Sequence, residues 1–254
     1  MSEISFELNT VLFESTFKIE QALGANVSVG TTFVVGRPYP DYPTKARFVL
    51  VTAKHVLEGM KGDVAVWHLR QKDGNGKWQR TPVPLQIRKN GVPCWLNHPV
   101  ADVSAMYVPL LPGVVNFLLP TAMFANDDIF TQFEIHPGDE LNCLGYPMGW
   151  ECNNNGFPIL RSGKIASYPL YPCKDYPTFL YDFEVFGGNS GGPVFMVESN
   201  RNFGGATHVG KIQFIAGLVS QQALHVNERL ALSVVVHASY IVETIDMLPS
   251  PSAA

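Results

Sequence analysis

The chain has 254 residues, of which 46% are hydrophobic and 16% are charged, so it can bury a sizeable apolar core. Its formal net charge of -4 and its lack of Lys and Arg runs exclude the basic surface that a nucleic acid backbone requires. No apolar stretch approaches the roughly 20 residues that span a bilayer, which excludes a membrane-embedded helix.

The N-terminus is acidic where a secretory signal has a basic region. Glu3 and Glu7 lie near the start of the chain, and no apolar segment of signal-peptide type follows them. The sequence therefore predicts a cytoplasmic protein.

Strand-like runs separated by turn residues fill the first half of the chain. They are rich in β-branched and aromatic residues and cover residues 31–35, 47–51, 64–69, 78–87 and 103–110. A short helix is expected at residues 54–60. This pattern predicts a first β unit over residues 1–125.

A second series of runs begins after residue 126. It covers residues 140–144, 159–167, 178–185, 193–197, 211–219 and 230–236. We expect these runs to form a second β unit over residues 126–254.

The C-terminal segment, residues 237–248, has helical periodicity. Its apolar stripe consists of Tyr240, Ile241, Thr244, Ile245 and Leu248. The stripe predicts a helix that packs one face on the core.

The four cysteines show no metal-binding pattern. None belongs to a C-x-x-C pair or lies beside histidines at metal-ligand spacing; they are Cys94, Cys143, Cys152 and Cys173. In a chain of this length without a secretory signal, we expect free thiols and no metal site.

The glycine-rich loop, residues 187–193 (Gly-Gly-Asn-Ser-Gly-Gly-Pro), is the sharpest candidate for chemistry. A nucleophilic serine needs an exposed hydroxyl beside converging backbone N–H groups, and glycines permit both the backbone conformation and close approach of a substrate. Ser190 is therefore a candidate nucleophile. A tight turn without chemistry is the alternative.

Residues 188–193 resemble the nucleophile loop of chymotrypsin-like serine peptidases, particularly HtrA-type and small bacterial members. Residues 51–57, with Thr52-Ala53-Lys54-His55, and residues 101–108, which begin Ala101-Asp102-Val103, resemble two further segments of that family in the same order. The resemblance covers residues 29–245. It implies an all-β fold of two six-stranded antiparallel Greek-key barrels with a C-terminal helix.

The resemblance also implies the role of each site residue. His55 would be the general base, since imidazole alone has an unperturbed pKa near neutrality. Asp102 would orient His55, and the N–H groups of Gly188 and Ser190 would hold the oxyanion. The implied activity is that of a serine endopeptidase acting on a protein or peptide substrate, with no metal or organic cofactor.

Substrate contacts are expected on two further segments. Residues 217–220 resemble the strand that pairs with the substrate backbone, so Leu218 and Ser220 are expected to bind substrate, and Ser220 also to support Asp102. Glu184 precedes Ser190 by six residues, where the family has the base of its primary pocket, which suggests a preference for Lys or Arg. A solvent-facing strand residue is the alternative.

Two other functions remain open. The loop also fits G-x-S-x-G, the nucleophile elbow of esterases with the α/β-hydrolase fold, although Pro193 and a strand-like run follow it where that fold needs a helix. A catalytically silent two-barrel module that only binds a partner is the second, and the intact set of His55, Asp102 and Ser190 disfavours it.

Overall fold

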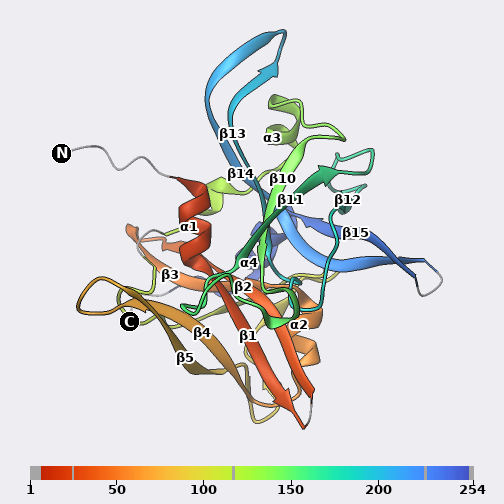
Figure 1. The fold of residues 1–254 in the computed structure, drawn as a ribbon. Coiled ribbons are helices and arrows are strands. Elements are labelled where there is room, and N and C mark those ends of the chain that lie inside the picture. The colour runs from red at the N-terminus through yellow and green to blue at the C-terminus, as the bar shows by residue number, and fades with distance from the viewer. Residues whose placement is uncertain (1–6, 25, 116–117, 226–227, 252–254) are drawn as a thin grey trace.

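The computed structural model describes residues 7–24, 26–115, 118–225 and 228–251. Strands dominate, and they form two antiparallel β units with short helices at their edges (Figure 1). Within these ranges, no helix has the length and apolar character needed to cross a bilayer. The all-β prediction is confirmed.

The first β unit is a seven-stranded antiparallel sheet with the order β5-β4-β1-β2-β3-β9-β8. It has one strand more than expected, because the two-residue β8 extends its edge. Two further short strands, β6 (Arg88–Lys89) and β7 (Val92–Pro93), pair only with each other. The strands of the main sheet are β1 (Thr16–Leu23), β2 (Asn26–Tyr39), β3 (Tyr42–Thr52), β4 (Val64–Lys72), β5 (Trp78–Gln86), β8 (Leu96–Asn97) and β9 (Ser104–Tyr107).

The second β unit is a closed barrel of six antiparallel strands in the order β10-β11-β12-β15-β14-β13, as expected. It lies above the first sheet in green and blue in Figure 1, and the β13–β14 hairpin extends far beyond it. The strands are β10 (Glu140–Gly145), β11 (Ile159–Ile165), β12 (Thr178–Asp182), β13 (Pro193–Phe203), β14 (Ala206–His225) and β15 (Glu228–His237).

Short helices connect and cover the strands. They are α1 (Leu8–Ser15), α2 (Lys54–Gly59), α3 (Asp127–Gln132) and α4 (Ala238–Met247), with the 3-10 turns η1 (Thr121–Met123) and η2 (Pro147–Gly149). All five residues of the predicted stripe on α4 are buried. The four cysteines are unpaired, as expected, and two of them are buried.

The segment before residue 29 departs from the sequence expectations, which placed neither helix nor strand there. Strand β1 lies inside the first sheet, between β2 and β4. Its apolar Phe17 and Ile19 are buried, but so are its polar Lys18 and Gln21. The strand does alternate polar Thr16, Lys18 and Glu20 with Phe17 and Ile19, but the sequence expectations do not use this pattern.

The two β units share one large apolar core. This core contains the interior of the first sheet together with helix α4 and Phe195, Ile215 and Leu218 of the barrel, while a second core fills the barrel itself. Helix α4 is anchored to the first unit, since Arg37 donates hydrogen bonds to the Leu248 carbonyl at 2.7 Å and to the Asp246 carbonyl at 3.4 Å. The division of the chain at residue 125 stays a prediction.

Candidate active site

His55 and Asp102 meet at the edge of the first sheet. His55 lies in the first turn of α2, directly after β3, and Asp102 lies between β8 and β9. The Nδ1 atom of His55 lies 2.7 Å from Oδ2 of Asp102, and the backbone N–H of His55 donates to Oδ1 at 3.0 Å. Oδ2 of Asp102 therefore contacts the imidazole, and Oδ1 holds the backbone of the same residue.

Ser220 extends this contact from the second β unit. Its hydroxyl donates to Oδ2 of Asp102 at 2.5 Å. Burial alone would raise the pKa of Asp102, but the hydrogen bonds from His55 and Ser220 outweigh burial and hold this pKa below its ordinary value. Asp102 is therefore ionised near neutral pH. This hydrogen bond is the contact that the sequence analysis expects between Ser220 and Asp102.

The glycine-rich loop packs against the strand end that carries His55. The Ser190 carbonyl accepts a hydrogen bond from the Thr31 N–H at 2.9 Å. A side chain at Gly191, whose φ is +87°, would lie 2.2 Å from both the Thr31 carbonyl and the Thr52 hydroxyl. Only glycine fits there. Thr52 is three residues before His55, so the packing of Gly191 against Thr52 places Ser190 near the strand end that precedes His55.

Ser190 as a residue is half-buried. Among the described residues, no hydrogen bond joins its hydroxyl to the His55 ring, although His55 is bonded to Asp102. In the absence of substrate, catalytic hydrogen bonds are often long or poorly aligned and tighten in the complex.

Gly188 and Ser190 of the loop have unpaired backbone N–H groups. Within the described part of the chain, neither the Gly188 N–H nor the Ser190 N–H donates to a backbone or side-chain acceptor. Gly188 has a φ of +98°, and a side chain there would lie 2.2 Å from the Tyr146 carbonyl. The Gly187 carbonyl, which shares a peptide plane with the Gly188 N–H, accepts a hydrogen bond from the Met148 N–H at 2.6 Å, and this bond fixes that plane. Free, oriented N–H groups are the donors that an oxyanion needs.

The structure corrects the substrate prediction for Leu218. Leu218 pairs with Pro193 on β13 and with Val236 on β15, and its side chain is fully buried. No peptide can add to a strand that is hydrogen-bonded on both edges. Pairing with β13 ends at Leu218, whereas pairing with β15 continues through Gln221 to His225. The edge open to a substrate therefore starts beyond Leu218, at Ser220 and Gln221.

Glu184 lies between β12 and the glycine-rich loop and is half-buried. Its carbonyl accepts a hydrogen bond from Arg161 at 3.2 Å, and the Arg161 guanidinium lies 4.6 Å from the Phe183 ring centre. Recognition of Lys or Arg by the Glu184 side chain stays a prediction.

Two cavities open at the candidate site. One of about 390 Å³ is lined by His55, Asp102, Ser220 and Gln221 among others. The other, of about 350 Å³, is lined by Val27, Val29, Met148, Phe186, Gly187 and Gly188. The first cavity therefore borders His55, and the second cavity borders Gly188, whose N–H is unpaired.

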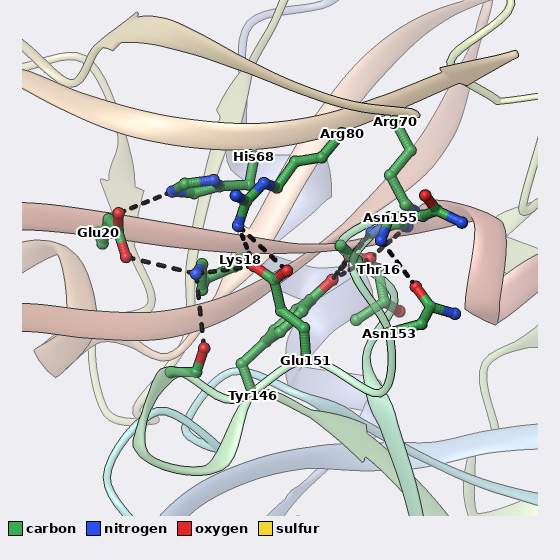
Figure 2. A network of polar contacts seen from close by, with 12 residues as sticks. Thr16, Lys18, Glu20, His68, Arg70, Arg80, Tyr146, Glu151, Asn153 and Asn155 are labelled. Atoms are coloured by element: carbon green, nitrogen blue, oxygen red, sulfur yellow. Dashed lines mark hydrogen bonds and ion pairs between the residues drawn. The ribbon is translucent and has the colours of Figure 1, made fainter. Parts of the chain in front are cut away.

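A polar network that the sequence does not predict surrounds the segment after β10 (Figure 2). We call it the charged clamp; its members are Lys18, Arg70, Arg80, Tyr146 and Glu151. It joins strands β1, β4 and β5 of the first unit to residues 146–156, which connect β10 and β11 of the second. No motif marks the clamp, since its residues come from three distant segments of the chain.

Arg70 is the centre of the clamp. It is fully buried and donates to the Tyr146 hydroxyl at 2.9 Å and to the carbonyls of Gly156 and Thr16, both at 2.6 Å. Burial raises the pKa of the Tyr146 hydroxyl to about 12, so it stays protonated and donates to the Thr16 carbonyl. The 146–156 loop is thus fastened to the first sheet.

No family model and no curated protein sequence matches the chain. Solved structures of HtrA-type and other trypsin-like serine proteases match its fold over most of its length. The HtrA-type protease AlgW with tripeptide has a TM-score of 0.53 at 13% identity, covering 93% of this chain and 60% of its own. The Rv3671c protease from M. tuberculosis, active form, has a TM-score of 0.54 at 18% identity, covering 97% and 86%.

A thermostable serine protease AL20 from an extremophilic microorganism has a TM-score of 0.51 at 13% identity, with 91% of this chain and 95% of that chain covered. At these identities the comparison establishes the fold. The chain thus has the two-barrel fold of trypsin-like serine proteases and spans 60% of the length of the AlgW chain.

Proposed function

We propose that the chain is a serine endopeptidase that hydrolyses peptide bonds through an acyl-enzyme on Ser190. The observation that carries the proposal is the hydrogen-bonded set of His55, Asp102 and Ser220, in a fold shared with serine proteases. The glycine-rich loop adds a serine and the unpaired N–H groups of Gly188 and Ser190. These are the parts that acyl transfer needs.

In the proposed reaction, Ser190 Oγ attacks the substrate carbonyl carbon while Nε2 of His55 takes the hydroxyl proton. Asp102 stabilises the imidazolium that results, and the N–H groups of Gly188 and Ser190 donate to the oxyanion. His55 then gives its proton to the leaving amine as the C–N bond breaks. Water attacks the acyl-enzyme in the same way, which releases the acid and regenerates Ser190.

The esterase alternative finds no support in the fold. An α/β-hydrolase needs a helix directly after its nucleophile, whereas β13 begins at Pro193, three residues after Ser190. The silent binding module keeps one observation in its favour, the missing hydrogen bond between Ser190 and His55. Reactivity of Ser190 separates it from an enzyme.

The test is labelling with a fluorophosphonate probe, which reacts with an activated serine. We expect the native protein to be labelled on Ser190, as mapped by mass spectrometry, and the His55→Ala variant to remain unlabelled. His136→Ala, which removes an exposed histidine of a turn, is the control and should label like the native chain. A folded native protein that stays unlabelled would overturn the proposal and favour the binding module.

The Glu184 hypothesis is tested on the same enzyme. If Glu184 forms the base of the primary pocket, peptides with Lys or Arg before the cut are the preferred substrates, and Glu184→Gln weakens that preference. Cleavage mainly after apolar residues would reject it.

A further inference from the structure

Residues 98–103 form the loop between β8 and β9 that carries Asp102. Apolar packing does not fix the middle of this loop, because Pro99 is exposed and Val100 is 82% exposed. Val100 lines two cavities, the one that contains His55 and a larger one of about 680 Å³. The backbone that leads into Asp102 is instead fixed by hydrogen bonds.

The His98 side chain accepts the hydrogen bonds that fix this backbone. Its Nδ1 atom accepts from the Ala101 N–H at 3.0 Å and from the Val100 N–H at 3.3 Å. The backbone N–H of His98 also donates to the Val103 carbonyl at 2.9 Å, so both ends of the loop meet at His98. The buried ring thus holds the chain up to the residue directly before Asp102.

The partners of the His98 ring assign its tautomer. Two backbone N–H groups donate to Nδ1, so this atom is unprotonated and Nε2 carries the proton. Nε2 lies 3.1 Å from the Glu243 carboxylate on α4, which accepts its hydrogen bond. Glu243 therefore favours the one tautomer in which Nδ1 can hold the loop.

Helix α4 also fixes the plane of the His98 ring. Tyr240, one turn before Glu243, packs against His98 in a T-shaped contact with ring centres 5.0 Å apart. The Tyr240 hydroxyl is held in turn, since it donates to the Cys173 carbonyl at 3.0 Å. A single turn of α4 thus sets both the tautomer and the orientation of the imidazole.

We infer that His98 is a positioning residue of the proposed active site: it holds the loop backbone in the conformation that directs the Asp102 carboxylate to His55. The inference deepens the proposed function and rests on it. The carboxylate contacts the His55 ring, the His55 N–H and the Ser220 hydroxyl, so a shift of the Asp102 backbone disturbs all three contacts. A displacement of about 1 Å in a catalytic site can lower turnover by about a hundredfold.

Two substitutions separate the bonds that the His98 ring makes. In His98→Asn the side-chain oxygen replaces Nδ1, because asparagine readily accepts from backbone N–H groups two and three residues further on, while the contact with Glu243 is lost. In His98→Gln the longer amide still reaches Glu243, but it has no acceptor atom at the position of Nδ1. The two variants therefore keep opposite halves of the arrangement.

The measurement is the reaction of the full chain with a fluorophosphonate, described by the limiting labelling rate, kinact, and the half-saturating probe concentration, KI. We expect His98→Gln to lower kinact by about tenfold or more with KI unchanged, and His98→Asn to stay within about threefold of the native rate. Equal rates for the two variants, whether both native-like or both low, would overturn the role of His98. A native chain that does not react would overturn the proposed function itself.

Glu243 provides a test that does not depend on the folding of the His98 variants. Its side chain is 59% exposed, so Glu243→Ala should fold, but it removes the acceptor that keeps the proton on Nε2. We expect kinact to fall by about threefold, because the other tautomer can then form. Asp246→Ala, which removes another exposed carboxylate of α4, should react like the native chain. Equal kinact for these two variants would overturn the inference.

Discussion

Two polar contacts of nearly the same length serve different purposes in this molecule. His55 and Asp102 are 2.7 Å apart with side chains 48% and 26% exposed, whereas Lys18 and Glu151 are 2.8 Å apart with side chains 9% and 11% exposed. The first pair faces a cavity, where the proposed reaction has it exchange a proton with a bound substrate. The second pair is nearly buried and joins β1 to the 146–156 loop, so it holds structure in place.

The difference in exposure matches a difference in proposed role: the exposed pair transfers a proton, and the buried pair holds the backbone in place. The substrate must reach the exposed pair, His55 and Asp102. This pair tolerates solvent because several hydrogen bonds to the Asp102 carboxylate fix its geometry. A buried ion pair is screened little by water, and removing one partner leaves an uncompensated charge. Variants of the exposed pair should therefore impair proton transfer. Variants of the buried pair should displace the 146–156 loop and, through it, the glycine-rich loop.

The largest effect is expected from Ser190→Ala. The variant removes the nucleophile, so kcat should fall by a factor on the order of 10⁶ while substrate binding is retained. Steady-state kinetics and peptide binding by the variant measure the two quantities. Ser162→Ala, at an exposed position of β11, should retain full activity. A Ser190→Ala enzyme that keeps more than a hundredth of the activity would contradict the account.

Asp102→Asn should come second. The amide cannot accept the proton of His55 in the same way or stabilise the imidazolium, so kcat should fall by about 10⁴ with the fold intact. Circular dichroism checks the fold and kinetics measure the loss. A fall of less than tenfold would show that His55 does not depend on this carboxylate.

Glu151→Gln is expected to act on the geometry instead. Without its charge, Glu151 no longer holds Lys18 and Arg80, and the 146–156 loop that bonds to Gly187 loosens. We expect kcat to fall about tenfold with little change in KM, because a small misplacement of an oxyanion donor is costly. Glu198→Gln, which breaks an ion pair with Arg201 on the distant β13–β14 hairpin, is the matched control. Equal kinetics for the two variants would contradict a positioning role for the clamp.

The smallest effect is a pH dependence of stability. Burial alone would raise the pKa of Glu151, but the hydrogen bond and charge of Lys18 and the charge of Arg80 hold it below its ordinary value. The ionised carboxylate therefore stabilises the folded state above the pKa of an unfolded Glu, near pH 4.3, and this contribution is lost as the pH falls through the lower folded pKa.

Urea unfolding of the native chain and Glu151→Gln measures this contribution. The native chain should be more stable by about 1 kcal/mol at pH 7, and the difference should shrink as the pH is lowered below about 4. A difference that grows on acidification would contradict the assigned direction of the pKa shift.

His55 and Asp102 can be located from the sequence because each lies in a short motif beside a strand end. Residues 52–55 predict a histidine at the end of β3, and residues 101–103 predict an acid just before β9. The C-terminal helix is predictable for a similar reason, since its stripe has a clear 3.6-residue period. In both cases, information close together in the sequence suffices.

The clamp could not be predicted, because long-range contacts define it, whereas strand β1 was missed although its residues alternate between polar and apolar. From sequence, Lys18 is expected at the surface. It is buried because Glu151, more than a hundred positions away, neutralises its charge. The error at Leu218 has the same origin. Alternation shows which face of a strand is buried but not which edge is already paired, and here both edges are.

The most direct test of the central claim is a crystal structure of the fluorophosphonate adduct. We predict phosphorus bonded to Ser190 Oγ, a phosphoryl oxygen within about 3.1 Å of the N–H groups of Gly188 and Ser190, and His55 still bonded to Asp102. An adduct on another residue, or one on Ser190 with the phosphoryl oxygen pointing into solvent and His55 turned away, would contradict the proposed site.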